Sequence, residues 1–490
     1  MKNRNYTHPA PSRVGCVPQR WRALCTVLVA CAVGLGACDD FLDITPEGQV
    51  KRDVLLQSQQ GIESALYGVY AQMRSTSLYG QQLSFDALGI MDQTFYSYGA
   101  TTITHLSEYD YDYSGVESIF DAVWTDMYAN ISNVNSILDC DLVAGASHYP
   151  YTLYRAEALA LRAFMHFDLL RLYAPQYTLL PEAEGIPYAK DFSLFTPDFE
   201  SLADNYAHIL ADLTEAEALL TVTEAEPVAE ATGFGADRET HMNLHAVRAT
   251  LARVCLTMGN RDAALRWAQK VIDESPCTLK NPDEVDKDVA GVLSTKETLF
   301  GLYAPDFYDI VYAKLYQTTS FYSLDCRTDL VDRYGDENYR PQANFSYVEV
   351  GGEQQLRFTK ILDKYELEGR TSARSSERIL GINLIRLPEM YYICAECLLD
   401  DDYPRAVEYF NEVLTHRGVQ PLDASSQERE LTLDVITEER YKELVGEGQT
   451  FYHLKRLNLP ITSYDGNTVW QPANSIYVVP IPDSEYENRY

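Results

Sequence analysis

The 490-residue sequence predicts a mainly α-helical protein in which long inserts of loop and short strand separate the helices. Three observations support this prediction. Apolar residues recur at spacings of three and four over long stretches, as they do on one face of a helix. Two segments far apart in the chain share one helix–turn–helix pattern. Hydrophobic residues make up 46% and charged residues 23% of the sequence, which is ordinary for a globular chain.

Three stretches carry the helical periodicity most clearly. Apolar side chains form a single stripe over residues 61–73, and residues 118–138 repeat this arrangement over a longer span. Residues 153–174 are apolar around most of the circumference, which predicts a helix buried between neighbours. Pro175 ends that helix, because proline cannot continue the backbone hydrogen-bond ladder.

The N-terminus has the features of a bacterial lipoprotein signal. Basic residues are the only charges before residue 39, and the 15-residue stretch ALCTVLVACAVGLGA follows them. This stretch is shorter than the roughly 20 residues that a membrane helix needs. Its last three residues and the following Cys38 read LGAC, which resembles a lipobox, where the cysteine becomes the lipidated first residue. The sequence therefore predicts a signal peptide over 1–37 and lipidation at Cys38, with an ordinary signal peptide as the alternative.

Net charge narrows the possible partners. The formal charge is -32, and nucleic-acid binding needs a basic surface, so nucleic acid is not an expected partner. Tyrosine is abundant, at 36 residues. Its ring is apolar and its hydroxyl is polar, which suits both core packing and contact with a polar ligand.

The shared helix–turn–helix pattern lies in residues 244–276 and recurs 142 residues later. The first copy carries Ala252, Cys255, Gly259, Ala264, Ala268, Val271 and Pro276, and the second carries Cys394, Cys397, Asp401, Ala406, Phe410, Val413 and Gly418. This spacing is typical of tetratricopeptide (TPR) repeats, whose small residues let antiparallel helices approach closely. The copies are not in tandem. Inserts at roughly 75–115, 176–200 and 275–385 predict a helical scaffold with excursions, not a uniform solenoid.

The pair Cys394-x-x-Cys397 has two interpretations. It is either a redox or metal pair, or two small side chains in the seam between helices. Cys255 holds the place equivalent to Cys397 and has no cysteine three residues before it, which favours packing. No P-loop, nucleophile elbow or zinc motif occurs, and we expect no cofactor.

The segment EERYKEL, residues 438–444, is rich in carboxylates. We interpret it as an internal ion-pair helix in which Glu438 pairs with Lys442, because these residues lie one turn apart.

Four stretches together resemble the SusD/RagB family of lipoproteins nearly end to end. They are the lipobox with DDFLDITPEG, WTDMYANISNVNSIL with AEALALRAFMHFDLLRLYA, LIRLPEMYYICAECLL, and ITEERYKELVGEGQTFYHLKR with YVVPIPDSEYENRY. The sequence departs from the family pattern at two positions. Tyr441 replaces the usual second arginine after ER, and Gln449 replaces the usual arginine after EG. We interpret both as packing variations.

The resemblance implies an all-α SusD-like fold with four TPR-like helix pairs and a ligand face carried by the inserts. It implies one domain over 38–490, with an N-terminal part to about residue 240 and a C-terminal part from about residue 241. SusD-like proteins are non-catalytic lipoproteins on the Bacteroidetes cell surface, and Asp39-Asp40 resembles their acidic export signal. They cover a SusC-like TonB-dependent transporter in the outer membrane and deliver oligosaccharides to it, or peptides in the RagB branch.

A glycan site needs aromatic rings for the CH faces of sugars and fixed polar partners for their hydroxyls. Two stretches offer both, and the resemblance implies that both inserts line the ligand face. The candidates are Asp92, Phe95, Tyr96 and Tyr98 in the early insert and Tyr303, Phe307, Tyr308 and Tyr312 in the later one. Aromatic core packing beneath a loop is the alternative in each case.

A weak calcium candidate lies in residues 107–115, where Glu108, Asp110 and Asp112 alternate with tyrosines. Calcium loops place oxygen ligands at alternate positions. The same alternation describes a strand with its acids outward and its tyrosines inward, and no glycine lies where a calcium loop turns.

The sequence thus predicts a lipid-anchored, outer-membrane surface receptor for oligosaccharides that acts with a SusC-like transporter. A RagB-like peptide receptor is the main alternative. A surface glycan hydrolase and a periplasmic TPR-type scaffold are the others.

Overall fold

The computed structural model describes residues 52–97, 99–193, 195–224, 233–281, 292–293, 296–317, 323–327, 329–337, 339–350, 352–362, 379–426 and 429–487. The chain divides into two compact units, Met1–Leu55 and Leu56–Tyr490. In the first unit, the described residues form helix α2 (Arg52–Leu55). The predicted signal peptide and Cys38 lie outside the described residues. All further description concerns the second unit.

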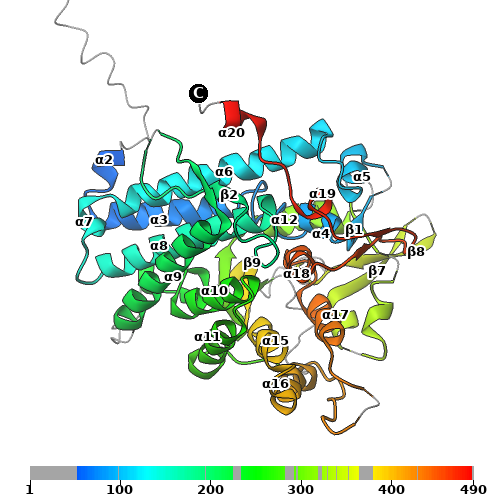
Figure 1. The fold of residues 1–490 in the computed structure, drawn as a ribbon. Helices are drawn as coiled ribbons and strands as arrows, with labels where there is room; N and C mark the ends of the chain where they lie inside the picture. The colour runs from blue at the N-terminus through cyan, green and yellow to red at the C-terminus, as the bar shows by residue number, and fades with distance from the viewer. Residues whose placement is uncertain are drawn as a thin grey trace, which may run out of the picture. The chain divides into compact units, whose positions relative to one another are not determined.

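Eight helices of the second unit form a continuous array of four pairs (Figure 1). Each helix contacts the next one in this order. The pairs are α3 (Gln59–Met73) with α6 (Ser114–Leu138), α8 (Tyr151–Tyr173) with α9 (Leu202–Thr223), α10 (Leu244–Thr257) with α11 (Arg261–Glu274), and α15 (Leu387–Leu398) with α16 (Tyr403–His416). This arrangement confirms the predicted mainly α-helical fold with TPR-like pairs.

The periodic stretches form the helices predicted for them. The apolar stripe of α3 is fully buried, and it includes Ile62, Leu66 and Val69. Helix α8 is buried around nearly its whole circumference, as its sequence predicted. It ends at Tyr173, two residues before Pro175.

The two TPR-like copies are neighbours in space although they are far apart in the chain. Helix α11 of the first copy packs against α15 of the second (Figure 1). Gly259 closes the turn between α10 and α11 with a φ of 75°, a conformation that glycine adopts without strain. The side chain of Asn260 then caps α11 by accepting a hydrogen bond from the backbone N–H of Ala263 at 3.2 Å. Because α11 and α15 are in contact, the long insert between them leaves the helical array and returns to it.

Shorter helices occupy the inserts and the C-terminal region. They are α4 (Ala87–Met91), α5 (Thr101–Ser107), α7 (Asp141–Ala144), α12 (Phe307–Val311), α13 (Tyr339–Asn344), α17 (Leu433–Leu444), α18 (Thr450–Leu457), α19 (Asn474–Tyr477) and α20 (Asp483–Glu487). A π-helical turn, η3 (Tyr312–Tyr316), continues α12, and 3-10 turns span η1 (Gly233–Gly235), η2 (Arg238–Thr240) and η4 (Asp332–Tyr334).

The strands are short and pair antiparallel in small sheets. One sheet has the order β4 (Val292–Leu293), β9 (Ile379–Arg386), β5 (Thr298–Tyr303), and the paired strands are β1 (Phe95–Tyr96) with β6 (Asp325–Cys326), β2 (Glu184–Pro187) with β3 (Phe199–Ser201), β7 (Phe345–Val350) with β8 (Glu353–Phe358), and β10 (Ile461–Thr462) with β11 (Val469–Trp470). The β1–β6 pair aligns Phe95 with Cys326, and it joins the early insert to the later one.

Residues 107–115 contain no strand: Ser107 ends α5, residues 108–113 form a turn, and α6 begins at Ser114. Tyr109 has a φ of 59°, which breaks any extended run. The alternation of burial nevertheless holds, because Tyr109 and Tyr111 are buried while the acids between and beside them are exposed.

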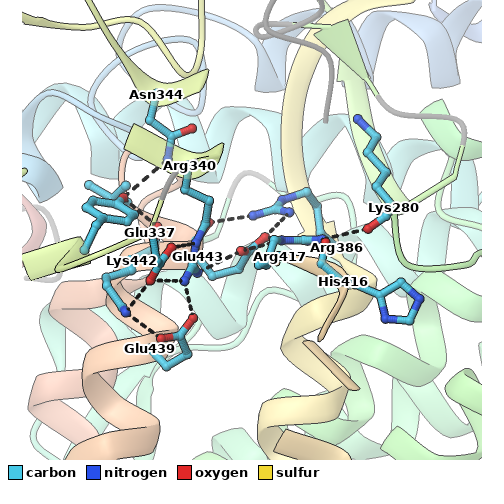
Figure 2. Close-up of polar contacts among 12 residues, drawn as sticks. Lys280, Glu337, Arg340, Asn344, Arg386, His416, Arg417, Glu439, Lys442 and Glu443 are labelled. Carbon is cyan, nitrogen blue, oxygen red and sulfur yellow. Dashed lines mark hydrogen bonds and ion pairs between the residues drawn. The ribbon is translucent and has the colours of Figure 1, made fainter. Parts of the chain in front are cut away.

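A buried ion-pair network joins the end of the helical array to the later insert (Figure 2). Glu443 on α17 lies at its centre and accepts hydrogen bonds from Arg417, at the C-terminal end of α16, at 2.8 and 2.9 Å. It also accepts one from Arg386, at the end of β9, at 2.8 Å. All three side chains are almost completely buried.

The same network continues on both sides of Glu443. Arg340 of α13 lies 3.4 Å from Glu443 and also pairs with Glu337 at 2.7 Å. Glu297, before β5, accepts from Arg417 at 2.9 Å. Burial alone would raise the pKa of Glu443, but the guanidinium groups of Arg417 and Arg386 hold that pKa well below its usual range. The carboxylate is therefore charged at every physiological pH.

The predicted ion-pair helix is thus confirmed for α17, but one predicted partner is wrong. Lys442 pairs with Glu439 at 2.7 Å and with Glu337 at 2.8 Å. Glu438 pairs instead with Arg333, at 2.8 Å between Oε1 and Nε. Spacing along one helix could not identify Glu337 and Arg333 as partners, because both come from the later insert.

We expect Glu443→Gln to lower the free energy of unfolding by about 3–5 kcal/mol, because it leaves buried guanidinium groups without a full counter-charge. Glu438→Gln, on the same helix but with a side chain 39% exposed, should cost at most about 1 kcal/mol. Urea unfolding of both variants measures this difference. Equal losses of unfolding free energy in the two variants would contradict the extra cost expected for removing the buried counter-charge.

Candidate ligand-binding face

The predicted residues of the early insert are mostly internal. Phe95 has no exposed surface, and its ring centroid lies 5.3 Å from that of Phe358. Tyr96 is buried and stacks on Tyr464, with ring centroids 4.0 Å apart. Tyr98 lies outside the described residues. The strand β1 therefore uses its aromatic rings to anchor the insert to the body of the protein.

The predicted residues of the later insert divide into two kinds. Phe307 is buried and packs edge-on against Phe85 of the early insert. Tyr303 at the end of β5 is 58% exposed, and Tyr312 is 36% exposed. Tyr308 is half-buried. The buried ring thus attaches the insert, and the exposed rings are left at the surface.

Three tyrosines form a ladder along α12 and η3. The ring centroids of Tyr308 and Tyr312 lie 5.7 Å apart, and those of Tyr312 and Tyr316 lie 5.3 Å apart. Residues four apart lie above one another on a helix, and the wider π-helical turn keeps this alignment to Tyr316. The sequence analysis missed Tyr316, although it follows Tyr312 at the same spacing of four that separates Tyr308 from Tyr312.

A cavity meets the segment that carries the ladder through Lys314, while the three ladder tyrosines are not among its lining residues. The cavity has a volume of about 630 Å³ and is lined by residues of α4, α5 and α6, together with Lys314 of η3. Lys314 lies between Tyr312 and Tyr316 in the sequence, and its ammonium group is 3.1 Å from the carboxylate of Asp86. This ion pair connects the later insert to the early one. We call the tyrosine ladder and this cavity together the ladder groove.

The walls of the ladder groove combine apolar and polar groups. Ile90, Ile103 and Leu106 supply apolar surface. Gln82 supplies a buried side-chain oxygen that has no hydrogen-bond partner among the described residues. Such an acceptor is a group that a bound hydroxyl or amide can satisfy. Aromatic and aliphatic surface with a few fixed polar groups is the usual composition of a small-molecule site.

Asp92, the fourth candidate of the early insert, does not line the ladder groove. It is buried and accepts a hydrogen bond from the backbone N–H of Thr94 at 3.0 Å. Burial raises the pKa of its carboxyl to about 7, against the opposing influence of Thr94, Arg327 and Arg333.

The calcium candidate is not supported. Glu108, Asp110 and Asp112 are exposed, and Asp110 pairs with His105 at 2.8 Å. Among the described residues, no three His, Cys, Asp or Glu side chains are grouped so as to hold a metal ion.

The cysteine pair of α15 has the packing role that the repeat pattern favoured. Cys394 and Cys397 are buried and unbridged, and so is Cys255 at the equivalent place on α10. Burial raises the pKa of Cys397 to about 12, which makes it a poor nucleophile.

The two positions that depart from the family pattern are filled by packed, hydrogen-bonded side chains. The hydroxyl of Tyr441 lies 3.0 Å from that of Thr94. The side-chain oxygen of Gln449 accepts a hydrogen bond from Arg171 at 3.1 Å. Both are therefore packing variations in this structure.

The array and the groove together define a TPR-like binding protein. Comparison with known proteins then identifies its family. A SusD-like family described as starch-binding and associating with the outer membrane matches residues 40–256, and the SusD family matches residues 326–488. The chain belongs to the SusD/RagB family.

Individual relatives can be aligned with nearly the whole chain. SusD-like protein P2 of Formosa agariphila is 23% identical, over 95% of this chain and 97% of the relative. A SusD superfamily structure from Bacteroides thetaiotaomicron matches with a TM-score of 0.72 at 22% identity, over 87% of this chain and 97% of that one. A SusD-like carbohydrate binding protein from Bacteroides vulgatus matches with a TM-score of 0.69 at 19% identity, over 87% and 95%.

Within the described residues, none of the helices combines the length and the apolar character that crossing a bilayer requires.

We expect the contribution of Asp92 to the stability of the protein to fall as the pH rises between about 4 and 7. Over this range the unfolded chain ionises Asp92 while the folded state keeps it protonated, and above pH 7 the folded state bears the full cost of the buried charge. Asp92→Asn removes this dependence and should be the more stable protein at pH 8, by at most about 4 kcal/mol.

Urea unfolding at pH 4.5 and pH 8 tests this expectation. The exposed Asp112→Asn is the matched control and should follow the wild type at both pH values. If the free energy of unfolding changed equally between the two pH values in the wild type and in Asp92→Asn, the raised pKa of Asp92 would be contradicted.

Proposed function

We propose that this protein is a non-catalytic receptor on the outer-membrane surface that captures oligosaccharides in the ladder groove and passes them to a SusC-like TonB-dependent transporter. The observation that carries the proposal is a cavity where the two inserts meet, whose wall includes Lys314, the residue midway between the ladder tyrosines Tyr312 and Tyr316 in the chain.

The chemistry of the ladder groove suits a neutral glycan. Sugar rings present CH faces that pack on Tyr312 and on the apolar wall, while their hydroxyls need fixed donors and acceptors. Gln82 offers an acceptor, and the Lys314–Asp86 pair offers both kinds of group. The groove volume, about 630 Å³, is enough for more than one sugar ring.

The family supports the same ligand class. One matching family is described as starch-binding, and the Bacteroides vulgatus relative is described as carbohydrate binding. A peptide ligand is the alternative, since the same donors and acceptors pair with backbone amides. A binding panel with both classes therefore decides between them.

We expect Tyr312→Ala to weaken oligosaccharide binding about tenfold, which corresponds to ~1.4 kcal/mol. The reason is the loss of the most central ring of the ladder. Isothermal titration calorimetry with maltooligosaccharides, laminarin oligosaccharides and tripeptides measures the effect. Tyr347→Ala is the matched control, because this tyrosine of β7 is 65% exposed and does not belong to the tyrosine ladder.

Peptide binding in place of glycan binding would favour the alternative ligand. Equal effects of Tyr312→Ala and Tyr347→Ala would remove the ladder groove as the site. Release of reducing ends from any glycan by the purified protein would contradict the non-catalytic assignment.

The proposed location on the outer-membrane surface can be tested through the lipidation of Cys38. We expect the mature protein from native membranes to begin at Cys38 with acyl chains attached, as detected by mass spectrometry. Cys38→Ala should release the protein from the membrane fraction while its glycan affinity stays unchanged. A wild-type protein with unmodified Cys38, or one that external protease cannot reach on intact cells, would contradict the surface assignment.

A further inference from the structure

A second cavity, of about 310 Å³, lies between α17, α18 and β10. It shares no lining residue with the ladder groove. Its volume is at the small end of the range for ligand sites, so it has room for one small molecule and not for a chain of sugars. We call it the α17–α18 cavity.

The α17–α18 cavity has a buried floor and an exposed rim. Asp92, Arg440 and His453 of the floor are each at most 7% exposed. The side chains of Asp329 and Glu438 are 50% and 39% exposed, and they mark the side that is open to solvent.

The charged groups of the cavity are balanced in pairs. Arg327 pairs with Asp329 at 2.5 Å, and Arg333 pairs with Glu438 through two hydrogen bonds. Arg440 pairs with Glu389 at 2.6 Å, outside the cavity wall. A charged ligand would therefore meet groups of its own sign, while a neutral ligand can use the remaining donor and acceptor positions of each pair.

Uncharged groups complete the wall. Hydroxyls come from three threonines, and apolar surface comes from Leu444, Leu454, Pro460 and Ile461. The Nε–H of Arg440 is buried and has no hydrogen-bond partner among the described residues. A buried donor without a partner costs free energy, and a ligand hydroxyl would satisfy it.

We propose that the α17–α18 cavity is a second binding site that takes one neutral hexopyranose. The ring hydroxyls pair with the carboxylates of Asp329 and Glu438 and with the Nε–H of Arg440, and one CH face packs on Leu454 and Ile461. This site binds a single sugar, in contrast to the extended ligand proposed for the ladder groove.

Saturation-transfer NMR and calorimetry on the mature protein test the site with D-glucose, D-galactose and D-mannose. D-glucuronate and D-glucosamine serve as charged probes of similar size. The variant Thr450→Trp fills the cavity from the start of α18. Thr415→Trp on the exposed face of α16 is the matched control.

We expect saturable binding of at least one neutral hexose, weakened tenfold or more by Thr450→Trp and unchanged by Thr415→Trp and Tyr312→Ala. If circular dichroism shows that Thr450→Trp is unfolded, Thr462→Trp at the exposed rim takes its place. Absence of hexose binding, binding that survives the filling variant, or preference for a charged probe would overturn the proposal. Hexose binding lost in Tyr312→Ala would assign it to the ladder groove, also against the proposal.

Discussion

The buried carboxylate of Glu443 is the constraint on which the arrangement of the ligand-binding face depends. It holds together Arg417 from the last helix pair, Arg386 from the sheet and Arg340 from the later insert. Without a central anion, the two fully buried guanidinium groups nearest to it would repel each other. The network therefore fixes how the later insert sits on the helical array.

This constraint reaches the ladder groove through a chain of contacts. Arg340 lies on α13, which leads into the β7–β8 hairpin. Arg357 of β8 pairs with Asp325 of β6, and β6 pairs with β1 of the early insert. Buried ion pairs contribute less net stability than apolar packing of the same volume, but they tolerate few alternative arrangements. We infer that the network serves chiefly to define one geometry for the two inserts.

Much of the scaffold could be predicted from the sequence, because helix periodicity and small residues at repeat spacing are local signals. The stripe of α3 and the α10–α11 turn at Gly259 are examples. The site was less predictable. The sequence shows Phe95 and Phe307 only as aromatic residues on inserts, but their burial depends on distant partners, Phe358 and Phe85. The two-residue strands that join the inserts leave no distinct sequence signal, whereas the spacing of four after Tyr312 does indicate Tyr316.

The most direct test of the account is a crystal structure of the mature protein with a bound oligosaccharide taken from the calorimetric panel. The account predicts sugar rings in the ladder groove, with one ring against Tyr312 and a hydroxyl within hydrogen-bond distance of the Gln82 side-chain oxygen. An oligosaccharide bound on another face, with the ladder groove empty, would contradict it.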